Sequence, residues 1–146
     1  MSTDNTKLRL AIFLAAFVSL AVLPAVINAQ VEKRVVFAKG KYSASYKGQL
    51  PRNYADYDAY IFRARKGQTL SFKLTTADPN AYVIVFETQQ ELGPDEDMIT
   101  AGEEQFPRIW SGKLPVTSEY SVQIYGARAF GEHSNRAPYT IEITIR

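Results

Sequence analysis

Polar and apolar residues alternate along most of this chain after residue 30. In 68–76, for example, Leu70, Phe72 and Leu74 share one face of an extended segment. Eight segments have this character or the length and composition of short strands: 32–38, 41–50, 57–64, 68–76, 80–87, 108–114, 119–125 and 139–145. No stretch after residue 30 has an apolar period of 3.6 residues. The pattern predicts an all-β domain of about eight short antiparallel strands, as a sandwich or a barrel.

The connections between these segments differ in length. The sequence RKGQ at 65–68 predicts a tight turn, because Gly67 can adopt a positive φ without steric cost. Segment 80–87 is almost wholly apolar, which predicts a central strand. Two connections, 88–107 and 126–138, are longer than a hairpin requires.

The first thirty residues have a different pattern. Lys7 and Arg9 precede an apolar run over 10–27, and the small residue Ala29 lies just before Gln30. The run is near the lower limit of the ~17–25 residues that span a bilayer. Pro24 and the small residue favour a cleaved signal peptide over an anchor. We therefore predict a signal peptide over 1–29 and one β-domain over 30–146, with no stable membrane insertion after cleavage. The protein is then periplasmic or secreted, a choice that the sequence leaves open.

Charge and cysteine content narrow the possible partners. The net charge of the chain is only +2, which argues against non-specific nucleic-acid binding. The chain has no cysteine, so the domain must be held by its core rather than by disulfides. Nothing in the sequence defines an oligomeric state.

Catalytic and metal-binding residues are scarce. The one histidine, His133, lies in a loop, and the chain has no cysteine. Because a zinc site usually needs several His or Cys ligands, we predict no metal site and no cofactor. The acidic residues of 88–107 lack the spacing of an EF-hand and are interpreted as a solvated loop. The sequence therefore indicates recognition rather than catalysis, and we predict that the protein is not an enzyme.

Three motifs occur in order: AKGxxSAxxxG at 38–48, ARKGQTLS at 64–71 and GKLPxxxxYSVxIY at 112–125. With APYTIEITI at 137–145, they make the chain resemble the periplasmic inhibitors of g-type lysozyme. The resemblance covers about 35–145 and extends, more loosely, to bacterial pre-peptidase C-terminal domains. It implies a β-sandwich whose loops at one end enter the lysozyme's substrate cleft.

The resemblance also implies two contact residues. Arg128 matches the inhibitors' first loop arginine, and its guanidinium suits the acidic groups of a lysozyme active site. The inhibitors also carry a tyrosine in the loop before the strand that corresponds to 57–64. Tyr54 is our choice for this tyrosine, with Tyr57 as the alternative.

One position departs from the family pattern. The inhibitors carry a second arginine four residues after the first, whereas this chain has Glu132 there. Arg136 is a candidate substitute from the far side of the loop. The competing hypothesis is a binding module for another protein or glycan, which would use exposed aromatic residues such as Phe130 and Tyr125.

Overall fold

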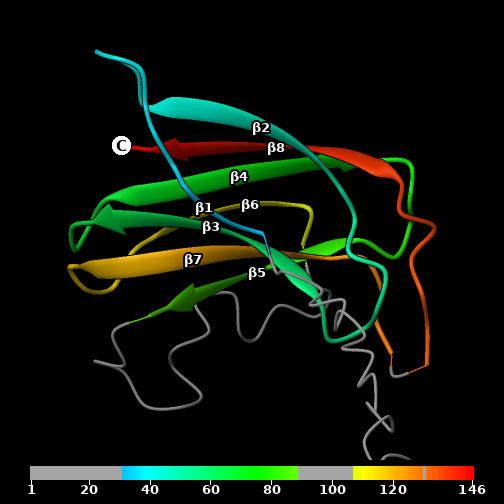
Figure 1. Cartoon of the computed structure of the whole chain (residues 1–146). Helices are drawn as coiled ribbons and strands as arrows, with labels where there is room; N and C mark the ends of the chain where they lie inside the picture. Colours follow the sequence, from blue (N-terminus) through cyan, green and yellow to red (C-terminus); the bar gives the residue numbers. More distant parts are fainter. Residues whose placement is uncertain (1–30, 89–106, 130) are drawn as a thin grey trace, which may run out of the picture.

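Two four-stranded β-sheets lie face to face in the computed structural model of the chain (Figure 1). The structure describes residues 31–88, 107–129 and 131–146. Its strands are β1 (Glu32–Arg34), β2 (Ser43–Gln49), β3 (Tyr57–Ala64), β4 (Thr69–Thr76), β5 (Tyr82–Glu87), β6 (Ile109–Lys113), β7 (Ser118–Tyr125) and β8 (Pro138–Ile145). The prediction of a β-sandwich of about eight short strands is confirmed.

The strand order is β1-β3-β7-β5 in one sheet and β2-β8-β4-β6 in the other. All neighbouring pairs are antiparallel except β1 and β3, which are parallel. The sandwich is antiparallel as predicted, with this one parallel pair as the exception among the described strands. The chain leaves β1 for β2 in the opposite sheet before it returns as β3, and this crossover gives the two strands the same direction.

Alternate residues of the strands form the core between the sheets. On β4 these are Leu70, Phe72 and Leu74, as the sequence pattern predicts. Tyr120, Val122 and Ile124 of β7 and the isoleucines of β8 face them and are at most 6% exposed. The turn at 65–68 forms as predicted, with Gly67 at φ 84° and a bond of 3.1 Å from Gln68 N to Arg65 O.

Strand β5 is apolar but lies at the edge of its sheet, so its prediction as a central strand is wrong. Val83 and Val85 face the core. Tyr82 and Ile84, on the other face, are also buried, at 5% and 6% exposure. The continuous apolar run therefore reflects the burial of both faces, which an edge strand can also have.

A buried polar link joins the two sheets. The hydroxyls of Tyr60 on β3 and Tyr139 on β8 are 2.8 Å apart, and the Tyr139 hydroxyl donates to Asp58 Oδ2 at 2.6 Å. Gly48 makes room for this link, because a Cβ there would lie 2.5 Å from the Tyr139 ring.

Two predictions fall outside the described residues: the signal peptide over 1–29 and almost all of the acidic connection over 88–107. Within the residues that the structure describes, no helix has the length and hydropathy to cross a membrane.

Candidate functional site

Three connections lie together at one end of the sandwich, the right-hand end in Figure 1. They are 50–56 between β2 and β3, 77–81 between β4 and β5, and 126–137 between β7 and β8. The register explains why they meet: Tyr125, the last residue of β7, pairs with the first residues of both β3 and β5. The loops that carry Tyr54 and Arg128 are therefore neighbours.

Direct bonds hold the first and third of these loops together. Asn53 and His133 form an isolated β-bridge. Ser134 is buried, its N–H donates to Arg52 O at 2.8 Å, and its hydroxyl donates to Pro51 O at 2.6 Å. At Gly126 a Cβ would lie 2.4 Å from Pro51 O, so the close approach of the loops requires glycine.

Arg128 is exposed, and its guanidinium is anchored on one side. Its Nε donates to Asn80 O at 3.1 Å, and its Cζ lies 5.9 Å from the centroid of the Tyr82 ring. Asn80 is itself fixed, because its N–H donates to the buried Asp78 carboxylate at 2.9 Å. The terminal nitrogens of Arg128 have no hydrogen-bond partner among the described residues, so the planar fork is available to a ligand.

Of the two candidate tyrosines, Tyr54 is the more exposed. It is 41% exposed, whereas Tyr57 is half-buried, with its ring centroid 5.4 Å from that of Tyr125. Tyr125 in turn stacks on Tyr82 at 5.0 Å. Burial raises the pKa of Tyr82, the nearby Tyr54 phenol raises it further, and Arg128 lowers it. Tyr82 thus lies within electrostatic reach of both Tyr54 and Arg128.

Glu132 folds back onto its own loop. Its Oε2 accepts a bond from the Arg128 N–H at 3.3 Å, and its own N–H donates to Ala129 O at 3.0 Å. The carboxylate at the position of the family's second arginine therefore helps to close the turn that presents Arg128.

The remaining candidates are placed elsewhere. Arg136 is exposed and lines a cleft on the side of the sandwich, whose lining does not include Tyr54 or Arg128. Tyr125 is half-buried between Tyr57 and Tyr82. Phe130 lies outside the described residues.

Three residues that position the site were not predicted: Asn80, Tyr82 and Ser134. The turn-forming sequence ADPN at 77–80 indicates a connection but does not say which loop its carbonyls would contact. Tyr82 is indistinguishable in the sequence from the core aromatics around it.

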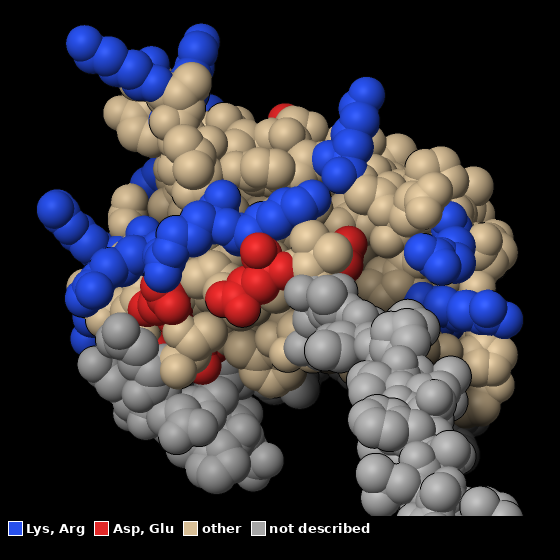
Figure 2. Space-filling model, viewed as in Figure 1, with Lys and Arg blue, Asp and Glu red and all other residues tan. Residues whose placement is uncertain are grey.

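The described residues contain no cluster of three or more His, Asp or Glu side chains suited to a metal. In the view of Figure 2, basic side chains reach the right-hand end of the molecule, where these loops lie. The fold and the site together define a β-sandwich recognition protein with its candidate contact groups on loops.

Comparison with known proteins gives the family. The inhibitor of g-type lysozyme from Escherichia coli (strain K12) is 27% identical over 143 residues, which are 96% of this chain and 97% of that protein. The crystal structure of the periplasmic inhibitor of g-type lysozyme from Aeromonas hydrophila matches with a TM-score of 0.61 and 31% identity. That match covers 80% of this chain and 96% of the Aeromonas protein. The chain therefore belongs to the family of periplasmic inhibitors of g-type lysozyme.

The corresponding inhibitor from Salmonella Typhimurium is 24% identical and has a TM-score of 0.57 over 81% of this chain and all of that one, which supports the fold alone. No protein-family model matches the sequence.

Proposed function

We propose that this protein inhibits g-type lysozyme by placing loops 50–56 and 126–137 in the enzyme's substrate cleft, with Tyr54 and Arg128 as contact residues. The observation that carries the proposal is the position of these two exposed side chains on adjoining loops at one end of the sandwich. Family membership identifies the enzyme, because the relatives are inhibitors of g-type lysozyme.

Arg128 supplies the charge for this contact. Glycoside hydrolases of the lysozyme type use a pair of carboxyl groups at the scissile bond. A guanidinium can bind a carboxylate through two parallel hydrogen bonds. Because Asn80 O and the Tyr82 ring already restrict the Arg128 side chain, binding costs less conformational entropy than for an unrestrained arginine.

Tyr54 supplies contact area beside that charge. A tyrosine ring has few rotatable bonds and carries a hydroxyl at its tip, so it offers a large contact at small entropic cost. Tyr57 and Tyr125 support the base of the loop end, because the Tyr57 ring packs at a tilt against Tyr125, which stacks on Tyr82.

The proposal includes export of the protein. Residues 1–29 act as a signal peptide, and 30–146 form the mature domain in the periplasm, the compartment of the solved relatives. There the protein would protect the cell's own wall from lysis.

The test is a titration of cell-wall lysis with protein expressed as the full chain and purified after export. We expect saturable inhibition of g-type lysozyme and none of c-type lysozyme. Inhibition of neither enzyme would contradict the proposal and would favour a different partner for the same scaffold. In that case the change at Glu132 is the first difference to test.

A further inference from the structure

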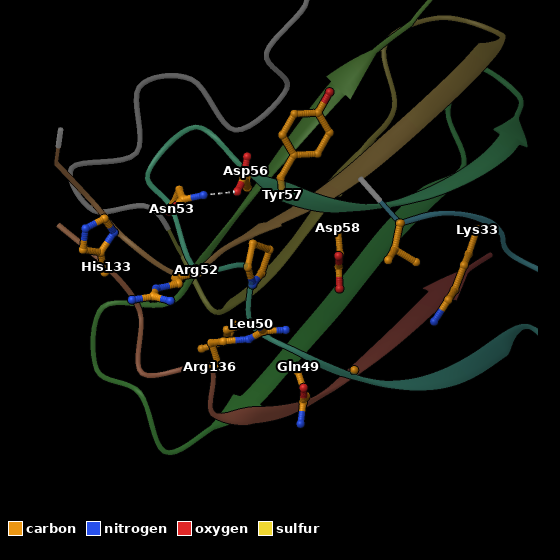
Figure 3. A pocket seen from close by; sticks show the side chains of 13 residues that line it. Lys33, Gln49, Leu50, Arg52, Asn53, Asp56, Tyr57, Asp58, His133 and Arg136 are labelled. Atoms are coloured by element: carbon orange, nitrogen blue, oxygen red, sulfur yellow. Dashed lines mark hydrogen bonds between the residues drawn. The ribbon is translucent and has the colours of Figure 1, made fainter. Parts of the chain in front are cut away.

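A cleft of about 800 Å³ opens on the side of the sandwich between β2 and β3 (Figure 3). Its walls include Lys33 of β1, Asp58 of β3, and residues of loops 50–56 and 126–137. The volume is in the range of small-molecule sites, ~300–1,000 Å³. Tyr54 and Arg128 do not line it, so the cleft shares its loops, but not its two contact side chains, with the proposed inhibitory contact.

Asp58 is a buried carboxyl group on the wall of this cleft. It is only 9% exposed, and the Tyr139 hydroxyl donates to it. Within the described residues no cation lies within ion-pair distance of it, since the one ion pair there joins Arg34 and Glu119. Burial raises the pKa of Asp58, and the bond from Tyr139 and the charge of Lys33 oppose that shift. Lys33 stabilises the Asp58 carboxylate through space but makes no ion pair with it, and a buried carboxylate without a cation in contact is unfavourable, so this position suits a ligand cation.

Arg136 provides the opposite charge. It is the only described non-glycine residue with a positive φ, 57°, a conformation that is uncommon for side chains other than asparagine and aspartate. The Ser134 hydroxyl holds it there by accepting the Arg136 N–H at 3.1 Å. In Figure 3 the Arg136 side chain extends toward the space that Asp58 and Lys33 also face. The described part of the chain offers its guanidinium no ion-pair partner.

We propose that this cleft binds a zwitterion, an α-amino acid or short peptide, with its ammonium group at Asp58 and its carboxylate at Arg136. Such a ligand neutralises both unpaired charges at once, whereas a simple anion or cation neutralises one and meets a like charge at the other. Lys33 and Arg52 on the cleft wall oppose ligands with a second ammonium group. The guanidinium fork favours a planar carboxylate.

Nuclear magnetic resonance titration with glycine, Gly-Gly and Gly-Gly-Gly tests the proposal, because the three probes differ in the separation of their charges. We expect saturable shifts at the Gly48, Asp58 and Arg136 amides, strongest for the probe whose length matches the cleft. N-acetylated and C-amidated forms of that probe each lack one charge. They should bind at least about tenfold more weakly, the loss expected for one charged hydrogen bond.

Two variants locate the charges. Asp58→Asn keeps an acceptor for Tyr139, and Arg136→Gln keeps a long polar side chain; each should weaken binding of the best probe about tenfold. Arg63→Gln, an exposed change on the same strand as Asp58, is the matched control. The proposal is overturned if no probe shifts the three amides saturably, or if both variants bind like the wild type. The titration contains no lysozyme, so either result can be obtained whether or not the protein inhibits that enzyme.

The buried Asp58 carboxyl group, which has no ion pair within the described residues, should make the stability of the fold depend on pH. Because the folded-state pKa is raised above its ordinary value of 3.8, protonation favours folding, and this contribution is lost as pH rises through the folded pKa. Asp58→Asn does not titrate, so it should unfold at a higher temperature than the wild type at pH 7. That advantage should shrink as pH falls toward 3.8, and thermal unfolding across this range measures it. A variant less stable than the wild type at pH 7 would show that the charge is compensated.

Discussion

The two ends of the sandwich use their connections differently. At one end, turn 65–68 and segment 114–117 are short and bind each other: Gly67 N–H donates to Leu114 O at 2.9 Å, and Leu114 N–H donates to Gln68 O at 2.8 Å. At the other end, loop 126–137 extends well beyond what is needed to join β7 to β8, and it is supported by 50–56 and 77–81. The extra residues of loop 126–137 include Arg128, which the proposed function uses, whereas turn 65–68 carries no residue that the proposed function uses.

The strongest test of this difference replaces one arginine at each end. Arg128→Ala should weaken inhibition of g-type lysozyme about tenfold or more, because the proposed function assigns the Arg128 charge to the enzyme's carboxylates. Arg65→Ala, in the short turn, should leave inhibition unchanged. Apparent inhibition constants from wall-lysis assays measure both. Equal effects of the two changes would mean that overall charge, and not the loop end, governs inhibition.

Substitutions at Tyr54 and Tyr57 should distinguish a residue that contacts the enzyme from one that stabilises the fold. Tyr54→Ala should weaken inhibition about five- to tenfold with little change in unfolding free energy, because the side chain is exposed. Tyr57→Ala should instead lower the unfolding free energy by about 1–3 kcal/mol, because it removes a half-buried ring that packs against Tyr125. Urea unfolding beside the inhibition assay distinguishes them. The reverse pattern would make Tyr57 the contact residue.

Ser134 tests whether the loops must be held together. Ser134→Ala leaves Pro51 O and Arg136 N–H without their buried partner, which should lower the unfolding free energy by about 1–3 kcal/mol. Inhibition should weaken about threefold as the loops lose their fixed spacing. Ser45→Ala, an exposed change on β2, serves as the control. A stability equal to that of the wild type would show that water replaces the lost bonds.

The smallest effect is expected at Glu132. Glu132→Gln keeps an oxygen acceptor for the Arg128 N–H and removes the negative charge. Inhibition should improve by about threefold or less, and more at low than at high ionic strength, because like-charge repulsion from the enzyme is screened by salt. Measuring association rates at two salt concentrations checks this. A weaker inhibitor would mean that the charge itself stabilises the turn.

The sequence predicted where the strands lie along the chain but not which strands lie side by side. The predicted segment 32–38 was too long, because β1 ends at Arg34. The predicted bounds of 57–64 coincide with β3, because apolar alternation and a following turn fix a strand locally. The parallel pairing of β1 with β3 and the edge position of β5 depend on contacts between distant segments, which no local pattern encodes.

The candidate site was also predicted only in part from the sequence. The motif resemblance gave the loop arginine and its neighbouring tyrosine as candidates, and the structure brings their loops together. The group that anchors Arg128 is the backbone carbonyl of Asn80, and every residue has such a carbonyl. Residue types therefore cannot reveal it. The left-handed conformation of Arg136 could not be predicted from the sequence either, because that backbone region favours glycine rather than arginine.

The link between Tyr60, Tyr139 and Asp58 connects the sheet that carries β7 to the sheet that carries β8, and loop 126–137 spans those two strands. In many exported domains a disulfide has this role, but this chain has no cysteine. The alignment of its loops is consequently indifferent to thiol–disulfide exchange. The domain should refold after denaturation without an oxidant or a disulfide isomerase, and as readily in a reducing buffer as in an oxidising one.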